Sequence, residues 1–247
     1  MEHAINRFEL KYVVDAFQAR AFFADLVPYM RPDPHGDAKG FYRVTSLYYD
    51  TPDYACRRAK TDGLKVRRKL RLRVYPTPGG VPDEGMVEIK QRIDKTVQKR
   101  RIRLPLDAAK DLCAGGPAPD GLDPECRRVA EEVGAIALQG VRPACVVTYL
   151  RRALVGSRYD RGVRVTVDAD LAARVHALDV AAPAANHRFL PPGFCILEVK
   201  VDERVPRWLA SLLAAHDFSL RRVSKYCLGL ETAMRSRVRW CPAGSVS

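Results

Sequence analysis

Residues 69–75 read Lys-Leu-Arg-Leu-Arg-Val-Tyr, with basic residues at 69, 71 and 73 and apolar residues at 70, 72 and 74. In a β-strand, residues two apart point to the same face of the sheet. The stretch therefore predicts a strand with one cationic face and one apolar face. Two cations on one face repel each other unless an anion lies between them. The pattern thus favours a strand that faces a bound anion.

Six further stretches alternate charged and apolar residues in the same way. They are Glu9-Leu10-Lys11, Glu88-Ile89-Lys90, Arg101-Ile102-Arg103, Tyr149-Leu150-Arg151, Arg164-Val165-Thr166-Val167-Asp168 and Glu198-Val199-Lys200. An ordinary antiparallel sheet also turns polar residues toward water. Here, however, that face holds almost no Ser, Thr, Asn or Gln. Many Arg and Lys with a few carboxylates suit a lumen that holds a polyanion together with a divalent cation.

The order of strands and helices predicts the fold class. Strand patterns lie near 7–14, 42–49, 69–75, 86–92, 98–104, 144–155, 163–171 and 194–201. We predict an α+β protein, in which a closed antiparallel β-barrel of about eight strands forms a tunnel with flanking helices. A lumen rich in Arg and Lys must be wet, because unpaired buried charges cost several kcal/mol each. The alternative places all these charges on a solvated outer face.

Helical patterns occupy the remaining segments. Asp15 is positioned to cap a helix that follows the first strand, and Pro206 and Ser224 each precede a further helix. Residues 105–140 read as a helical insertion, since strands resume directly afterwards. We expect a single domain over residues 1–240 and a tail at 241–247.

Composition and charge narrow the class of partner. The chain of 247 residues has 42 Lys and Arg against 29 Asp and Glu, a net charge of +13. Such an excess favours phosphate-rich partners. The seven cysteines are odd in number, and none forms a metal-finger spacing, which is typical of a reduced cytosolic protein. We expect a cytoplasmic protein, since the N-terminus does not resemble a signal peptide and no apolar run has the ~18 residues of a membrane span.

The motifs, taken in order, resemble the polyphosphate polymerase (VTC) domain of the CYTH-like triphosphate tunnel metalloenzyme superfamily. The resemblance rests on Arg7-Phe8-Glu9-Leu10-Lys11-Tyr12, Tyr48-Tyr49-Asp50-Thr51-Pro52, the stretch 69–75, Glu88-Ile89-Lys90, Lys99-Arg100-Arg101, Tyr149-Leu150-Arg151-Arg152, the stretch 164–168, Ile196-Leu197-Glu198-Val199-Lys200 and Ser224-Lys225-Tyr226. Each motif alone is weak, but their joint order from residue 7 to about 230 is specific.

The resemblance implies roles for individual residues. A phosphate clamp with a catalytic role would consist of Lys11, Arg71, Arg73, Lys90, Arg151, Arg164 and Lys225. Lys99, Arg101 and Lys200 would join it in binding substrate, with Lys99 and Arg101 resting on the weaker signal of a three-residue basic run. Glu198 would be the principal ligand of a divalent metal, Mn²⁺ or Mg²⁺, with Glu9, Glu88 and Asp168 as helpers. The alternative for each oppositely charged pair is a simple cross-strand ion pair.

One departure from the superfamily bears on the reaction. Its hydrolases and cyclases usually open with two glutamates and a lysine at alternate positions, and here the first of these positions is Arg7. A hydrolase benefits from extra carboxylates that hold metal and accept a proton from water. A terminal phosphate oxygen is already ionised near neutral pH, so its attack needs only positioning and charge neutralisation. The arginine therefore favours phosphoryl transfer between phosphates.

Three functions follow as hypotheses. The leading one is a polyphosphate polymerase that transfers the γ-phosphoryl group of ATP to inorganic polyphosphate. The second is a tripolyphosphatase or nucleoside triphosphatase of the same fold, and the third is a non-catalytic module that binds polyphosphate or RNA. We expect no sequence-specific binding of nucleic acid, because the tyrosines lie within strand patterns. Eukaryotic relatives carry membrane helices, so a separately encoded membrane partner stays open.

Overall fold

The computed structural model of the protein describes residues 7–75, 80, 82–94, 96–158, 160–202 and 204–239. The predicted tail at 241–247 and most of the loop predicted at 76–80 lie outside these residues, as does the side chain of Arg7. The helices are α1 (Ala16–Leu26), α2 (Ala55–Thr61), α3 (Leu106–Cys113), α4 (Pro124–Ala137), α5 (Arg207–Ala215) and α6 (Lys225–Arg239). Among the described helices, none has the length and apolar composition needed to cross a bilayer.

The strands form an antiparallel sheet, which confirms the predicted α+β class. They are β1 (Arg7–Asp15), β2 (Met30–Pro32), β3 (Phe41–Asp50), β4 (Val66–Val74), β5 (Glu84–Ile93), β6 (Thr96–Pro105), β7 (Arg142–Gly156), β8 (Arg164–Arg174), β9 (His187–Arg188) and β10 (Phe194–Asp202). Eight of them follow one hydrogen-bonded order, β1-β10-β8-β7-β3-β4-β5-β6, while β2 pairs with β7 and β9 with β8. Within the described residues no pairing joins β1 to β6, so hydrogen bonds do not close this sheet into the barrel that was predicted.

The chain divides into two compact units. Unit 1 takes its described residues from 7–43, 149–171 and 190–224, and unit 2 takes them from 44–148, 172–189 and 225–239. Strands β3, β7 and β8 each contribute residues to both units. The predicted single domain over 1–240 stays a prediction.

Unit 1 buries one face of β1, β10 and β8 beneath helix α1. Tyr12 and Val14 of β1 and Leu197 and Val199 of β10 share an apolar cluster with Phe22 of the helix. Charged residues one position away along each strand therefore take the opposite face. Asp15 caps α1 as predicted, since its side chain accepts a hydrogen bond from the Gln18 amide at 2.8 Å.

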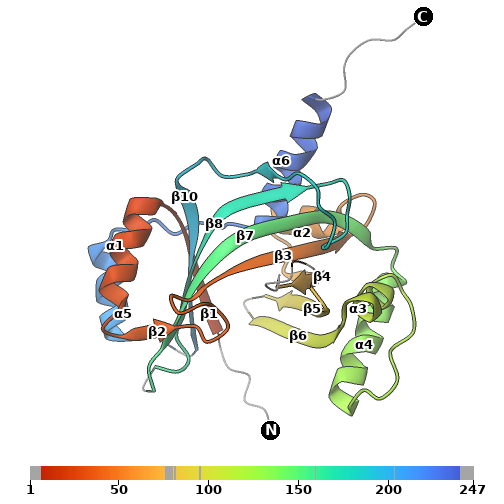
Figure 1. Ribbon diagram of the computed structural model, residues 1–247, viewed down its shortest axis with the longest axis horizontal. Coiled ribbons are helices and arrows are strands. Elements are labelled where there is room, and N and C mark those ends of the chain that lie inside the picture. The colour runs from red at the N-terminus through yellow and green to blue at the C-terminus, as the bar shows by residue number, and fades with distance from the viewer. Residues whose placement is uncertain are drawn as a thin grey trace, which may run out of the picture. The chain divides into compact units, whose positions relative to one another are not determined.

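Unit 2 buries one face of β4, β5 and β6 beneath helices α3 and α4 (Figure 1). Leu72, Val87 and Ile89 are wholly buried there and pack with Leu112 and Val133 of the two helices. Helices α3 and α4 fall within the segment expected to be helical, 105–140. The basic residues of 69–75 alternate with this core, so the cationic face lies on the side of the sheet away from α3 and α4.

Candidate functional site

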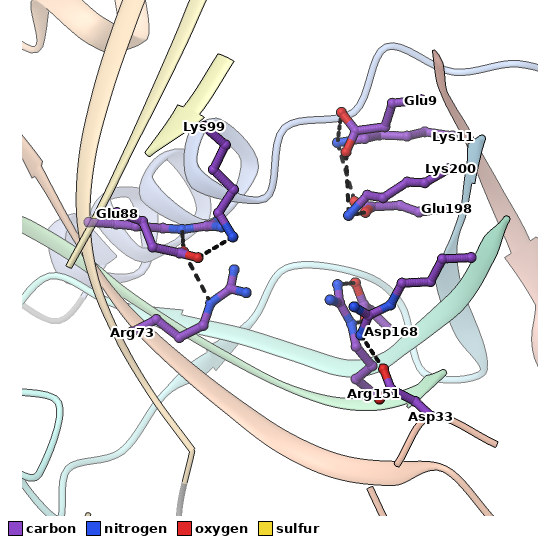
Figure 2. Close-up of polar contacts among 12 residues, drawn as sticks. Glu9, Lys11, Asp33, Arg73, Glu88, Lys99, Arg151, Asp168, Glu198 and Lys200 are labelled. Atoms are coloured by element: carbon purple, nitrogen blue, oxygen red, sulfur yellow. Dashed lines mark hydrogen bonds and ion pairs between the residues drawn. The ribbon is translucent and has the colours of Figure 1, made fainter. Parts of the chain in front are cut away.

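Two strands of unit 1 place a quartet of alternating charges side by side. The antiparallel register sets Glu9 opposite Lys200, and Lys11 opposite Glu198. Each lysine ammonium lies 3.2 Å from Glu198 and 3.6 Å from Glu9, so every member touches two opposite charges. Figure 2 shows the four side chains next to one another. This quartet brings together two predicted metal ligands and two predicted phosphate ligands.

Two further ion pairs of unit 1 involve predicted clamp arginines. Arg151 makes a bidentate contact with Asp168, at 2.6 Å from Nε and 2.8 Å from Nη2 (Figure 2). Burial acts to lower the pKa of Arg151, but the Asp168 carboxylate raises that pKa well above its ordinary value. Arg164 Nη2 lies 2.5 Å from Asp33 Oδ2 and donates a hydrogen bond to the Tyr42 hydroxyl at 2.7 Å. Both predicted clamp arginines of this unit thus have a carboxylate partner from the protein.

A buried carboxylate organises the cationic face of unit 2. Glu88 is 1% exposed, and its Oε2 lies 2.5 Å from Arg71 Nε and 3.6 Å from Arg73 Nε. Its other oxygen makes an ion pair with Lys99 Nζ. Figure 2 shows Arg73 and Lys99 both directed at this carboxylate. The anion predicted to lie between Arg71 and Arg73 is therefore, in part, the protein's own glutamate.

The remaining predicted cations of unit 2 lie next to this cluster on neighbouring strands. The register aligns Lys69, Lys90 and Lys99 across β4, β5 and β6, so three lysines form one row. Lys69 Nζ lies 5.2 Å from the ring centre of Tyr226, the residue after Lys225 at the start of α6. In the next row, Arg101 lies opposite Glu88 and is exposed.

The three basic residues at 99–101 separate as strand geometry requires. Arg100 points to the helical side, where its Nε and Nη2 each lie 2.6 Å from the carboxylate of Glu132 in α4. Lys99 and Arg101 lie on the opposite face, with Glu88. The two predicted substrate ligands of this run, Lys99 and Arg101, therefore lie on the same face as the cation cluster, and Arg100 does not. Their role in binding substrate stays a prediction.

The crowding of cations shifts several pKa values. Burial acts to raise the pKa of Glu88, but Arg71, Arg73 and Lys99 together hold it well below its ordinary value. Burial lowers the pKa of Lys99 to about 8, against the opposing effect of Glu88. Burial also acts to raise the pKa of Tyr48, but the charges of Arg71 and Arg73 bring it below the ordinary value. The face is thus a region of strongly positive potential.

The two units differ in charge balance. In unit 1, Lys11, Lys200, Arg151 and Arg164 face four carboxylates, those of Glu9, Glu198, Asp168 and Asp33. In unit 2, three cations share the single carboxylate of Glu88. An added anion is therefore attracted most strongly to the face of unit 2. A divalent cation is better matched to the carboxylate pair of unit 1.

The four predicted metal ligands are not equally suited to a divalent ion. No group of three or more His, Cys, Asp or Glu with metal-binding geometry occurs within the described ranges. Glu88 is surrounded by three cations, and Asp168 is held by Arg151 on both oxygens. Glu9 and Glu198 also pair with cations, Lys11 and Lys200, but at the longer distances of 3.2 and 3.6 Å, and the two carboxylates lie together. Mg²⁺ and similar hard ions are commonly held by one or two carboxylates plus substrate phosphates. This pair fits a metal whose remaining ligands are phosphate oxygens and water.

Several polar residues of these clusters have no site role predicted from the sequence. Asp33 lies in a loop, where no periodic pattern marks it, yet it is 2% exposed and pairs with Arg164. Tyr48 accepts a hydrogen bond from Arg71 at 3.1 Å, and Ser46 one from Arg73 at 3.4 Å. These two alternate with Asp50 along β3, and that spacing could have identified them.

Comparison with known proteins agrees with this architecture. The profile of the family described as VTC domain matches residues 6–234. A candidate adenylate cyclase from Bacillus halodurans has a TM-score of 0.51 and 12% identity over 89% of this chain and 96% of that chain. The PH1819 protein from Pyrococcus horikoshii OT3 has a TM-score of 0.47 and 16% identity, with 91% and 98% covered. No curated protein matches the sequence. The Bacillus likeness shows a shared fold.

Replacing Glu88 by Gln should destabilise the protein in a way that an added anion reverses. The substitution leaves three cations without their carboxylate, and breaking a buried pair costs about 3–5 kcal/mol. Thermal unfolding should show a lower midpoint for Glu88→Gln, and tripolyphosphate should raise that midpoint more than it raises the wild type's. Glu84→Gln on the same strand is the control, because Glu84 is 60% exposed and pairs only weakly with Arg103. Equal tripolyphosphate shifts in the two variants would contradict the assignment.

Affinity for tripolyphosphate should fall with rising pH because of Lys99. Its pKa of about 8 means that the ammonium loses its proton, and its charge, above that pH. Anion binding favours the charged form, so the wild type should take up a proton on binding near about pH 8. Lys99→Arg keeps its charge throughout and should show a flatter affinity profile from about pH 7 to about pH 9. Isothermal titration calorimetry measures the affinity of both proteins at each pH. Tripolyphosphate itself titrates equally in both experiments, so a difference between the two affinity profiles reports on Lys99. Parallel profiles would exclude Lys99 as the titrating group.

Proposed function

The chain belongs to the VTC domain family, and from this membership together with its cation clusters we propose that it is a polyphosphate polymerase. The substrates would be ATP and inorganic polyphosphate, and the product a polyphosphate chain longer by one phosphate. The observation that carries the proposal is the excess of cations over carboxylates around Glu88. Each phosphate added to a chain brings about one negative charge, and in the part of the chain that the structure describes three cations gather around the one carboxylate of Glu88.

The proposed reaction needs little proton chemistry from the protein. An ionised oxygen of the terminal polyphosphate group forms a bond to the γ-phosphorus of ATP, while the bond from that phosphorus to the β,γ-bridging oxygen breaks and ADP leaves. Both nucleophile and leaving group are phosphate oxygens, so charge neutralisation and alignment dominate catalysis. A bound Mn²⁺ or Mg²⁺ would supply further charge neutralisation, with Glu198 and Glu9 as its protein ligands.

Individual side chains have distinct tasks in this proposal. Arg71 and Arg73 offer guanidinium donors whose fork geometry matches phosphate oxygens. Their contacts with Glu88, Tyr48 and Ser46 fix the orientation of both side chains before any ligand binds. Lys11 and Lys200 would offset phosphate charge beside the carboxylate pair. Arg151 and Arg164 would act from positions set by Asp168 and Asp33.

The products of ATP consumption distinguish this function from its alternatives. Purified protein incubated with ATP and Mn²⁺, and separately with Mg²⁺, should yield ADP and polyphosphate in equal phosphate equivalents, with little free phosphate. ADP with equal free phosphate would establish a hydrolase instead. Tight polyphosphate binding without turnover would establish a binding module. Arg73→Ala should lower turnover by about 10²-fold or more, as other lost charge-stabilising donors do. Arg100→Ala, on the helical side of the same sheet, is the matched control.

Arg101 and Arg103 should contribute to binding long polyphosphate and not tripolyphosphate. Both lie on β6 and are exposed, Arg101 opposite Glu88 at the edge of the cluster and Arg103 two residues further along, opposite Met86. A chain longer than a triphosphate can reach them, whereas a triphosphate held by Arg71 and Arg73 needs neither. For long-chain polyphosphate, the slope of the logarithm of the binding constant against the logarithm of the salt concentration should become less steep by about one for each arginine removed in the double variant Arg101→Ala/Arg103→Ala. Tripolyphosphate affinity should stay within about twofold of wild type. Equal losses for both ligands would place these arginines inside the triphosphate clamp.

A further inference from the structure

Thr166 of β8 carries a buried hydroxyl to which none of the described residues is hydrogen-bonded. The residue is 0% exposed, and among the described residues its Oγ1 makes no hydrogen bond. Two other buried polar atoms share this state, Arg164 Nε and Asp33 Oδ2, but both belong to side chains that form an ion pair with each other. Thr166 has no such compensation. Buried polar groups in folded proteins are nearly always satisfied, so an orphan hydroxyl points to a missing ligand or water.

The register of the sheet places this hydroxyl beside the carboxylate pair of unit 1. Thr166 lies directly opposite Glu198, which in turn lies opposite Lys11 of β1. Side chains of directly opposite residues share a face of the sheet and have Cβ atoms about 4.5–5.5 Å apart. The face therefore brings the Thr166 hydroxyl together with the carboxylates of Glu198 and Glu9 and with the two lysines that pair with them.

The neighbours of Thr166 carry both signs, since Lys11 and Lys200 each lie 3.2 Å from Glu198. The hydroxyl itself lies directly opposite the Glu198 carboxylate, and that carboxylate would repel a phosphate oxygen in this position but attract a cation. A divalent cation would be attracted by Glu198 and Glu9 and could accept the hydroxyl oxygen as a further hard ligand. Threonine and serine hydroxyls bind Mg²⁺ in this way in phosphate-binding loops.

We propose that Thr166 Oγ1 is the third protein oxygen of a divalent-cation site formed with Glu198 and Glu9. The proposal rests on the proposed function in one respect: the metal is the one that polyphosphate synthesis would use. The binding of the metal itself can be measured without substrate. The site thus consists of two carboxylates on β1 and β10 and one hydroxyl on β8, with phosphate oxygens or water completing the shell.

Thr166→Val tests this assignment, because it removes the hydroxyl and keeps the branched shape. Mn²⁺ alone is titrated into each protein, and free Mn²⁺ is followed by electron paramagnetic resonance. We expect the dissociation constant of Thr166→Val to rise about tenfold or more. Thr166→Ser, which keeps the hydroxyl, should bind Mn²⁺ within about twofold of wild type, and Glu198→Gln should lose most of the affinity. Thermal unfolding of Thr166→Val should show an unchanged or higher midpoint, since no residue that the structure describes hydrogen-bonds to the lost hydroxyl.

A second threonine separates a ligand role from a structural one. Thr148 Oγ1 accepts a hydrogen bond from Thr45 Oγ1 at 3.3 Å, so Thr148→Val should lower the unfolding midpoint and leave Mn²⁺ binding unchanged. Wild-type Mn²⁺ affinity in Thr166→Val, or a loss of thermal stability like that of Thr148→Val, would overturn the proposal. Wild-type affinity in Glu198→Gln would overturn it as well. Mn²⁺ binding that depends on Thr166 in a protein that makes no polyphosphate would refute the polymerase function alone.

Discussion

The burial of the apolar strand faces is the constraint on which both charged clusters depend. Leu72 and Ile89 are fully buried, and each is a sequence neighbour of a charged residue of the cluster. A shift of one residue in strand register would exchange the two faces and expose the core. The hydrophobic residues therefore fix where every charged residue lies. The register between strands then brings Glu88 between Arg71 and Arg101 and Lys11 beside Glu198.

Buried charges of one sign need compensation, and the two units achieve it differently. Unit 1 pairs its cations with carboxylates, as in the bidentate contact between Arg151 and Asp168. Unit 2 gathers Arg71, Arg73 and Lys99 around the one carboxylate of Glu88. A guanidinium has five donor hydrogens, so a single shared carboxylate leaves capacity for phosphate oxygens. The unequal balance separates a face suited to polyanions from one suited to a divalent cation.

Pre-existing contacts orient these ligands before substrate arrives. The Arg71 guanidinium contacts Glu88 and the Tyr48 hydroxyl, and Arg73 contacts Ser46. Long side chains lose conformational entropy when they are immobilised, and here folding has already restricted them. Electrostatic catalysis depends on such preorganisation, because charges that are already in place need no rearrangement as the reaction proceeds. The same reasoning gives Asp33 a function in holding Arg164, although Asp33 lies in a loop.

By itself, the sequence determined the α+β class, the main strands and helices, which residues of a strand share a face, and the family. These features depend on local periodicity and capping, such as the two-residue alternation of 69–75 and the Asp15 cap. It also favoured, on a weak signal, Lys99 and Arg101 as substrate ligands. Only the tertiary structure decided which opposite charges meet. The contacts of Glu88 with Lys99, of Arg164 with Asp33 and of Arg100 with Glu132 each join residues from different elements. The unsatisfied hydroxyl of Thr166 and its position opposite Glu198 likewise cannot be read from one strand. The physical reason is that periodicity sets the direction of a side chain within its own strand, whereas its partner depends on the register and packing of other elements.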